Sequence, residues 1–297
     1  MKNKNIGKIR RCPFCEVEDN ATLGAPYQTC FNNINYYYIK CLSCKIVYVH
    51  PVPDDKTLKK IYTKNNYHEI HYTNDYSNYK LYYSQILIDI SKYFNSNITF
   101  LDYGCGIGYF LKFLKENNIH AEGVEFDLNT VKEAKKNSNG NTMTVEEFDK
   151  TSNKYDFIYL GDVLEHLNDP IEIIRKLTER INQGGYLCIE GPLERNISFA
   201  NYCVIFNSFI KNIIISSFTS SHPPLHLIFT GKKQQIRFFD KFNNLKFVKY
   251  TLYETGWPLI SESLFKSILG NISKLLSKLP FFKLFYGNRI RIILIKS

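Results

Sequence analysis

The chain has 297 residues, enough for one large domain with an accessory part or for two smaller domains, and hydrophobic residues make up 44% of it. This composition excludes a globally disordered chain. The formal net charge of +10 would suggest an anionic partner. We attribute the excess to lysines scattered along the whole chain rather than to a focused basic groove, and we expect no nucleic-acid partner.

The start of the chain bears on where the protein works. Residues 1–11 are charged, and no apolar segment follows them, so the central region of a secretory signal is missing. We therefore expect a cytoplasmic protein. In a reducing compartment, the eight cysteines are more often metal ligands or buried thiols than disulfide partners.

Four of these cysteines form two pairs near the amino terminus. Cys12 with Cys15, and Cys41 with Cys44, have the C-x-x-C spacing that places two thiolates on one turn. Four soft ligands suit a tetrahedral zinc ion and leave no open coordination position, so we expect zinc in a structural role. Residues 1–53 are predicted to form this zinc-binding module.

Downstream, the sequence alternates between two periodicities. Residues 54–97 have apolar side chains at intervals of three to four and are predicted to be a helical connector. From residue 98 short apolar runs alternate with helical patterns, which predicts an α/β domain over 98–297 with a mostly parallel sheet and helices on both faces. The expected strands are 99–102, 121–125, 142–145, 155–160, 186–190, 246–253 and 290–295. The expected helices begin near Gly108 and span 129–137 and 171–181.

Residues 191–230 interrupt this alternation and are predicted to be an irregular insertion. Within them, 201–219 approaches the length of a membrane span but contains Lys211 and several Asn and Ser residues. We interpret it as a helix or lid packed on the protein. Attachment to a membrane interface, together with the Lys-rich segment 272–285, is the alternative.

A glycine-rich loop follows the first strand of the predicted sheet. Asp102 ends this strand, and Gly104, Gly106 and Gly108 allow the backbone to turn sharply and to approach a ligand closely. The next helix then points its N–H groups at a carboxylate or phosphate. Glu125 ends the second strand about twenty residues on, at the position of an acid that accepts hydrogen bonds from ribose hydroxyls.

These residues resemble the class I S-adenosylmethionine-dependent methyltransferases. The matching segments are 102–108, Glu125, 155–158, 162–167, Asp169 with Pro170, and 184–187. The G-x-G-x-G spacing favours this family over nicotinamide-binding proteins. The resemblance implies a Rossmann-like, seven-stranded, mostly parallel sheet and a methyltransferase that uses S-adenosylmethionine.

The resemblance also implies which residues hold the cofactor. The loop and its preceding acid are expected at the methionine end and Glu125 at the ribose. Glu147 is expected beside the adenine, with Glu146 and Phe148 as alternatives. The full expected set is Asp102, Gly104, Cys105, Gly106, Gly108, Glu125, Phe126, Glu147, Gly161 and Asp162.

The N-terminal segment carries a second resemblance. The run from Cys41 through 46–49 to Pro51, Leu58 and Tyr62 looks like the zinc-binding segment of bacterial methyltransferases that modify sugars. By analogy this implies an acceptor oxygen or carbon on a sugar, a nucleotide-sugar or a surface glycan, with a role in polysaccharide biosynthesis.

Methyl transfer needs a group that removes a proton from the nucleophile, and histidine suits this step at neutral pH. His226 lies in a segment that resembles the substrate-facing Pro-x-His-Leu stretch of the sugar-modifying relatives, so we favour it as the base. His222 is a weaker substitute. His166, in the Glu-His pair after the fourth strand, is a further candidate or a residue that positions the cofactor loop.

Two alternatives remain open. The pattern Asp162-x-x-Glu165-His166 resembles a divalent-metal motif of quinone and RNA-end O-methyltransferases, and His226 can complete that site. This predicts a metal-assisted O-methyltransferase of a quinone or lipid-like substrate. A non-enzymatic zinc-ribbon nucleic-acid binder is the other alternative, against which the intact glycine loop argues.

Overall fold

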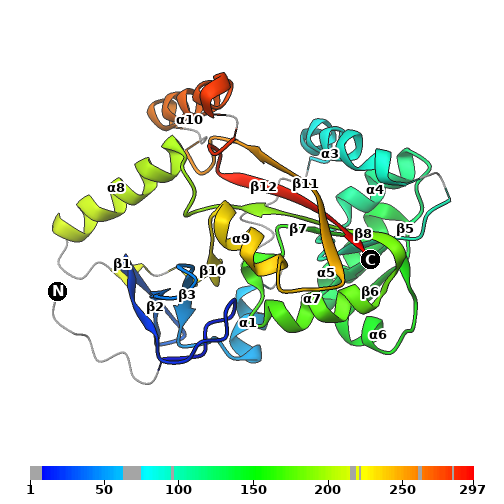
Figure 1. Ribbon diagram of the computed structural model, residues 1–297, viewed down its shortest axis with the longest axis horizontal. Helices are drawn as coiled ribbons and strands as arrows, with labels where there is room; N and C mark the ends of the chain where they lie inside the picture. Colours follow the sequence, from blue (N-terminus) through cyan, green and yellow to red (C-terminus); the bar gives the residue numbers. More distant parts are fainter. Residues whose placement is uncertain are drawn as a thin grey trace.

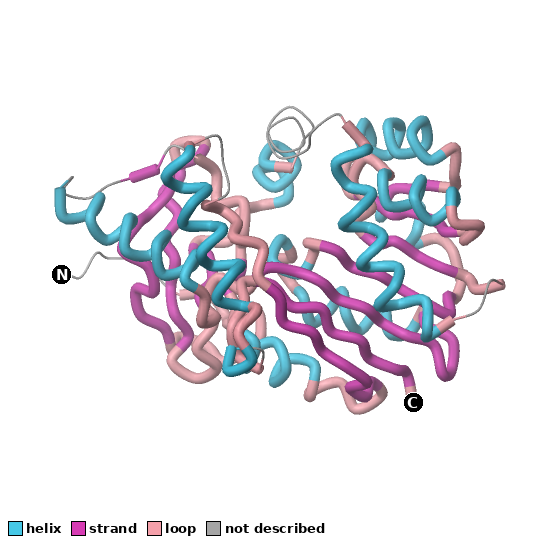
Figure 2. The backbone as a smooth tube through the Cα atoms, turned by 90° about the horizontal axis from the view of Figure 1, so that it is seen from above, coloured by secondary structure: helices cyan, strands magenta, loops and turns pink. Residues whose placement is uncertain are grey.

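The protein consists of two sheets that lie at opposite ends of the molecule (Figures 1 and 2). The computed structural model describes residues 9–62, 75–94, 97–214, 219–220, 222–259, 263–282 and 284–297. Part of the predicted connector, 63–74, lies outside these ranges.

The larger sheet has seven strands in the order β11-β12-β8-β7-β4-β5-β6. Six of them run in one direction, and β12 is antiparallel to both of its neighbours. The predicted α/β fold with a mostly parallel, seven-stranded sheet is therefore confirmed. The strands are β4 (Phe100–Tyr103), β5 (Ala121–Glu125), β6 (Thr142–Thr144), β7 (Tyr155–Gly161), β8 (Ile181–Pro192), β11 (Leu245–Tyr253) and β12 (Arg289–Lys296).

Alternating side chains bury both faces of this sheet. Phe157 and Tyr159 of β7 belong to an aromatic core beneath one set of helices, whereas Ile158 and Leu160 belong to the core on the other face. The first set includes α3 (Ser77–Ile90), followed by the 3-10 turn η2 (Ser91–Tyr93), and α4 (Tyr109–Glu116). The second includes α6 (Val145–Asp149), α7 (Pro170–Glu179) and α9 (Lys232–Phe239).

Local sequence signals fix where the helices begin. Asp169 accepts a hydrogen bond from the Glu172 N–H at 3.0 Å and precedes a proline at the first position of α7. Asp127 accepts from the Thr130 N–H at 2.9 Å at the start of α5 (Leu128–Ser138). These two helices and α4 confirm the predictions from helical periodicity.

The smaller sheet has the order β10-β3-β2-β1-β9. The three inner strands, β3, β2 and β1, come from the amino-terminal part of the chain. The two edge strands, β10 and β9, come from the segment predicted to be an irregular insertion. There β10 pairs with β3, and β9 pairs with β1. The strands are β1 (Ala21–Phe31), β2 (Ile34–Cys41), β3 (Val47–His50), β9 (Thr219–Ser220) and β10 (Ile228–Phe229).

The two sheets share one hydrophobic core. The ring of Phe14 stacks on Phe238 of α9 with a centroid separation of 4.2 Å, and the Lys241 ammonium donates to the Phe14 carbonyl. The Val49 N–H of β3 donates to the Leu227 carbonyl at 2.9 Å. The small sheet is therefore packed against the large one through side chains, and not joined to it only by a linker.

Five helical elements remain. The short helix α1 (Asp55–Ile61) follows the small sheet, and η3 (Leu164–His166) follows β7. Helices α8 (Phe199–Ile214) and α10 (Leu264–Ser277), the latter followed by the turn η4 (Pro280–Phe282), lie along the upper left of the molecule (Figure 1). None of the described helices combines the length and the apolar character that crossing a membrane requires.

Candidate active site and cysteine cluster

The glycine loop has the conformation that its sequence predicts. The φ angles of Gly104, Gly106 and Gly108 are +83°, +54° and +80°, in the left-handed region that favours glycine. A Cβ atom added at Gly104 would lie 2.3 Å from Cγ2 of Val163, so a side chain there requires that neighbour to move. The loop thus fits closely against the residue that follows Asp162.

Glu125 holds this loop from the end of β5. Its Oε2 accepts a hydrogen bond from the Gly106 N–H at 2.8 Å, and its Oε1 accepts from the Phe126 N–H at 2.6 Å. A carboxylate offers about four acceptor positions, so lone pairs remain for ribose hydroxyls. Burial raises the pKa of Glu125 despite these two backbone hydrogen bonds.

Asp102 lies beneath the loop and is almost fully buried. Desolvation raises the pKa of its carboxyl to about 8, and the charge of Glu125 contributes to the rise. The next helix begins at Gly108 without a side-chain cap, which leaves N–H groups of its first turn for a carboxylate. Cys105 is buried beside them. The ammonium and the carboxylate of a methionine moiety, which share one α-carbon, suit this pair of features.

The residues expected near the adenine occupy different environments. Phe126 is partly exposed next to Glu125. Glu147 uses its carboxylate in a capping box, where its Oε2 accepts from the Thr144 N–H at 2.8 Å. Phe148 is fully buried against Tyr103, with ring centroids 5.9 Å apart, so its ring supports the strand and does not face a ligand.

The end of β7 carries an ion pair that the sequence does not reveal. Asp162, expected to contact the cofactor, follows Gly161 and has a φ of +55°. Its Oδ1 accepts a hydrogen bond from Nη2 of Arg289 at 2.6 Å. Arg289 begins β12, which was recognised only as an apolar strand, and no spacing signal connects it with the motif after β7.

Behind Asp162, the structure buries a charged network around Glu190 of β8. Nε of Arg291 donates to Glu190 Oε2 at 2.5 Å, and the hydroxyls of Tyr82 and Tyr253 donate to its Oε1. Burial alone would raise the pKa of Glu190, but the charges of Arg291 and then Arg289 lower it overall. The network joins α3, β8, β11 and β12 at the carboxyl end of the sheet.

The two favoured histidines lie side by side at the same end of the sheet. The rings of His166 and His226 are 5.0 Å apart and nearly perpendicular. Together with Glu165, they place three ligand atoms within 4.8 Å of one another. The sequence motif after β7 and the segment around His226 therefore converge, whereas His222 is exposed and outside this group.

Nδ1 of each imidazole already makes a hydrogen bond. His166 Nδ1 lies 2.8 Å from the Leu225 carbonyl, so it carries the proton and donates. His226 Nδ1 lies 2.6 Å from Oε1 of Glu194. Nε2 is the other nitrogen of each ring and can accept a proton or bind a metal ion. Nε2 of His166 lies 3.9 Å from Oε1 of Glu165.

The carboxylates around His226 set its proton affinity. Burial alone lowers the pKa of His226, but the hydrogen bond and the charge of Glu194 raise it overall, with smaller contributions from Glu165 and Asp162. Burial, and then the charge of Asp162, raise the pKa of Glu165 to about 8. Oε1 of Glu165 is buried without a hydrogen-bond partner among the described residues.

Three residues of this site escaped prediction. Glu194 orients His226, the Tyr62 hydroxyl donates to the Leu225 carbonyl at 2.7 Å, and the Trp257 ring stacks on His226 at 6.3 Å. Glu194 follows the strand that ends at Pro192, so its position at a carboxyl end of the parallel sheet was the one signal that could have identified it.

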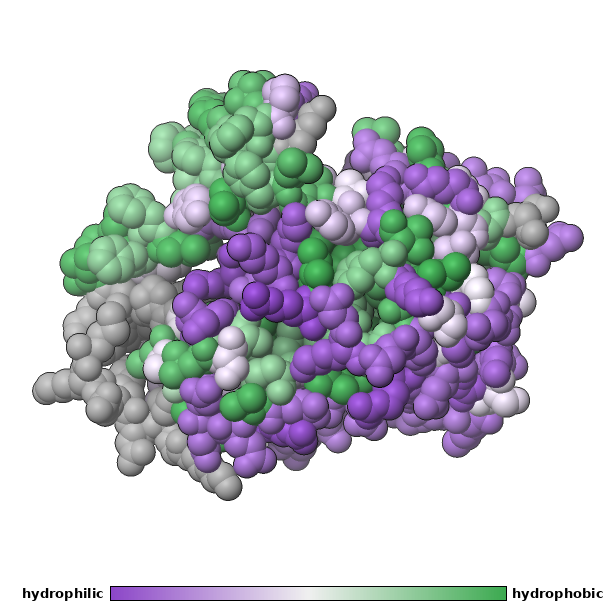
Figure 3. Space-filling view, viewed as in Figure 1, coloured by the Kyte–Doolittle hydropathy of each residue, from purple (hydrophilic) through white to green (hydrophobic). Residues whose placement is uncertain are grey.

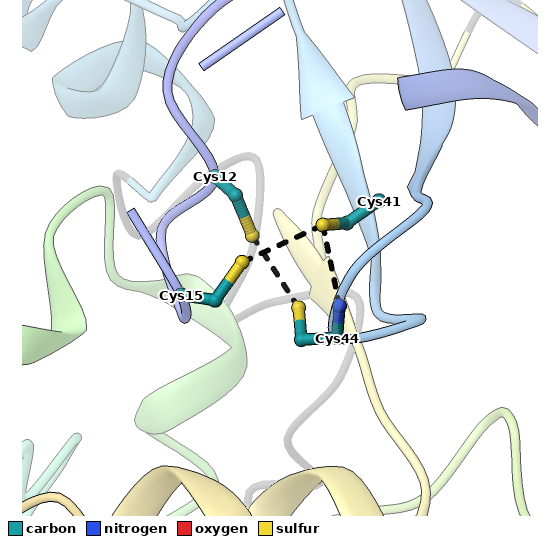
Figure 4. A group of neighbouring side chains, drawn as sticks. All are labelled: Cys12, Cys15, Cys41 and Cys44. Atoms are coloured by element: carbon teal, nitrogen blue, oxygen red, sulfur yellow. Dashed lines mark hydrogen bonds between the residues drawn. The ribbon is translucent and has the colours of Figure 1, made fainter. Parts of the chain in front are cut away.

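The four paired cysteines converge at the small sheet (Figure 4). The sulfur atoms of Cys12 and Cys44, and those of Cys15 and Cys41, are 3.5 Å apart. Thiolates bound to one tetrahedral zinc ion at ~2.3 Å would be about 3.8 Å apart. The donor set and its spacing therefore fit zinc, and they leave no open position for a reacting ligand.

Comparison with known proteins agrees with this geometry. Residues 76–221 match the model of the methyltransferase-domain family. The ubiquinone biosynthesis O-methyltransferase of Coxiella burnetii is 26% identical over 135 residues, which are 41% of this chain. The match spans 57% of the length of that enzyme.

A solved structure extends the likeness of the fold. It is the plantazolicin methyltransferase BamL in complex with a triazolic desmethyl-plantazolicin analogue and S-adenosylhomocysteine. The two chains are 15% identical, and the alignment covers 81% of this chain and 93% of the other with a TM-score of 0.51. The chain is therefore similar to the methyltransferase-domain family over residues 76–221, and its fold is similar to that of BamL.

Proposed function

We propose that the protein transfers a methyl group from S-adenosylmethionine to an acceptor that binds beside His226. When bound, S-adenosylmethionine supplies an electrophilic methyl group. Asp102, the glycine loop and Glu125 would hold it, with Phe126 beside the adenine. The observation that carries this proposal is the close contact of Gly104 with Val163, because it connects the cofactor loop directly to the turn that bears Glu165 and His166.

In this proposal His226 is the base. Its Nδ1–H donates to Glu194, which fixes the tautomer and leaves Nε2 to accept the proton of the nucleophile. His166 is a positioning residue whose ring is held by the Leu225 carbonyl. Both rings are only partly open to solvent, which limits the water that competes with the acceptor.

The acceptor class rests on resemblance. The N-terminal cysteine module packs against the segment that bears His226, since Val49 of β3 bonds Leu227. A module of this kind in sugar-modifying methyltransferases supports a sugar, nucleotide-sugar or glycan acceptor, methylated at oxygen or carbon. The exposed Trp257 ring beside His226 supplies an apolar face of the kind that sugars stack on.

A metal-assisted O-methyltransferase is a second candidate, favoured by a different observation. Oε1 of Glu165, which has no hydrogen-bond partner among the described residues, and one nitrogen of each histidine form a set of one carboxylate and two imidazoles. Glu194 and the Leu225 carbonyl orient the imidazoles from behind, as second partners of metal-bound histidines do. A divalent ion there would bind acceptor hydroxyls. The likeness to a ubiquinone biosynthesis enzyme makes a quinol-like acceptor the natural test case.

The first test is calorimetric titration with S-adenosylmethionine and S-adenosylhomocysteine. We expect binding by the native chain and none by Glu125→Lys, because the new ammonium removes the acceptor of the Gly106 N–H and places a positive charge at the ribose. Glu179→Lys, at an exposed position of α7, is the matched control and keeps the affinity. A folded, zinc-loaded native chain that binds neither ligand would contradict the proposal.

Chelation separates the two candidate functions. Under the first, removal of a weakly bound divalent ion that leaves the cysteine cluster loaded does not change the methylation rate. Under the second, the same treatment abolishes the rate, and adding back Mg²⁺ or Mn²⁺ restores it.

We also propose that the cysteine cluster binds one structural zinc ion. We expect one zinc per chain by metal analysis and a melting temperature lower by about 5 °C or more in Cys41→Ser, because the ion stabilises only the folded arrangement of its ligands. Cys30→Ser, in the same sheet but outside the cluster, is the control and keeps both values. Equal zinc content in the two variants would contradict the assignment.

A further inference from the structure

An apolar surface on α8, α10 and η4 takes no part in the proposed chemistry. Figure 3 shows it as a continuous hydrophobic area over the upper left of the molecule, whereas most of the remaining visible face is polar. Its most exposed large side chains leave between 64% and 78% of their surface open to solvent. They are Phe206, Ile213, Ile214, Leu264, Phe265, Leu275, Phe281 and Leu284.

The two chain segments that carry this surface are basic, although Arg289 and Arg291 at the end of the second belong to the charged network around Glu190. The sequence contains no Asp or Glu between residues 195 and 239 or between 263 and 297, and these two segments hold twelve of the 38 Lys and Arg residues. The rest of the chain carries 26 basic and 28 acidic residues. The net charge of +10 therefore does not reflect lysines scattered along the whole chain, as composition alone had suggested.

Several of these charges lie next to the apolar side chains. Lys266 and Lys278 are exposed on α10 and just after it, and Lys211 is exposed in the last turn of α8. Buried contacts hold the two helices together, since the Ala200 N–H donates to the Ser273 hydroxyl at 3.1 Å. The apolar surface is thus presented on two fixed helices bordered by lysines.

From these observations we infer that this surface binds peripherally to a membrane rich in anionic lipid. Amphipathic helices with apolar side chains on one face and lysines at its border insert into the headgroup region. Lysines near such a surface strengthen binding by attraction to the lipid charge. An apolar protein partner gives no reason for acidic residues to be absent from both segments, whereas repulsion from anionic headgroups does.

The surface is also close to the proposed site. Ser198, just before α8, donates to Glu254 at 2.7 Å, and Trp257, three residues after Glu254, contacts His226. Helix α8 therefore begins beside the segment that carries Trp257, and α10 is bonded to α8. Attachment through them keeps the site near the lipid surface, whichever acceptor it uses.

The test is flotation of the full chain with vesicles. One set contains phosphatidylcholine alone and the other equal parts of phosphatidylcholine and phosphatidylglycerol. We expect the native protein to float with the anionic vesicles, and Phe265→Ser with Phe281→Ser to weaken binding by about tenfold or more. The matched control is Leu81→Ser with Ile88→Ser, two equally exposed apolar positions on α3, and it binds as the native chain does.

Charge is tested separately. Lys266→Glu with Lys278→Glu lowers the affinity for anionic vesicles by about fivefold for each lysine, and Lys132→Glu with Lys136→Glu on α5 does not. Cofactor titration stays unchanged in all four variants, so failure of this inference is distinct from failure of the proposed function. The inference is overturned if the native chain does not float, if the controls lose as much binding, or if light scattering shows a dimer that Phe265→Ser with Phe281→Ser abolishes.

Discussion

Replacing His226 by asparagine is expected to lower kcat by about 10² to 10⁴-fold, the usual contribution of a general base. The asparagine amide keeps a donor toward Glu194 but has no nitrogen that accepts a proton, so folding and cofactor affinity are retained. The measurement is the initial rate of methyl transfer, with cofactor titration as the folding control. A variant within threefold of the native rate would show that another group takes the proton.

The pH dependence identifies the same group. The pKa of His226 lies above its ordinary value of about 6.5, so the neutral base is depleted as pH falls through this raised value and the rate falls with it. Glu194→Gln removes the hydrogen-bonded charge and leaves burial to act, so the acidic limb of kcat against pH moves to lower pH. The charges of Glu165 and Asp162 remain and limit the shift. An acidic limb at the same pH in this variant would exclude His226.

Arg291→Met is expected to reduce the free energy of unfolding by about 3 to 5 kcal/mol. Arg291 and Glu190 are both buried, and removal of the guanidinium leaves a carboxylate without its main counter-charge. The measurement is chemical denaturation. The double variant, Arg291→Met with Glu190→Gln, recovers much of the loss, because a neutral amide can still accept from the surrounding tyrosines.

The dependence of the unfolding free energy on pH is the second test of the Arg291–Glu190 ion pair. The folded-state pKa of Glu190 is lowered, so the pair stabilises the fold above the unfolded-state pKa and the stabilisation is lost as pH falls through the lowered value. In Arg291→Met the folded-state pKa of Glu190 rises, so the loss of stability on acidification is smaller. A single variant that loses less than about 1 kcal/mol would show that Arg289 and the tyrosines alone compensate for the buried charge.

The central sheet and its glycine loop could be predicted because their signals are local. Short apolar runs mark strands such as β7, and Gly104 with Glu125 marks the loop through spacing alone. The pairing of β9 and β10 with the small sheet could not be predicted, because a strand of two residues has no periodicity.

The site likewise contains residues that the sequence predicts and residues that it does not. Glu165 and His166 are neighbours in a recognisable motif, and His226 lies in a recognisable segment. Glu194, Arg289 and Trp257 reach the site only through the arrangement of strands and loops that are distant in sequence. A single sequence holds no local signal for such partners, since their roles depend on what the fold places opposite them.

The pairing of β9 and β10 with strands from the start of the chain affects how the protein folds during synthesis. On the ribosome, β3 emerges early with one edge unpaired, and its partner β10 appears only once the sequence through Phe229 has been synthesised. The small sheet therefore cannot be completed before the central sheet is largely in place. A fragment that contains β1 to β3 but lacks β10 would leave one edge of β3 unpaired. Because an unpaired strand edge is a template for aggregation, such an amino-terminal fragment is a poor choice for separate expression.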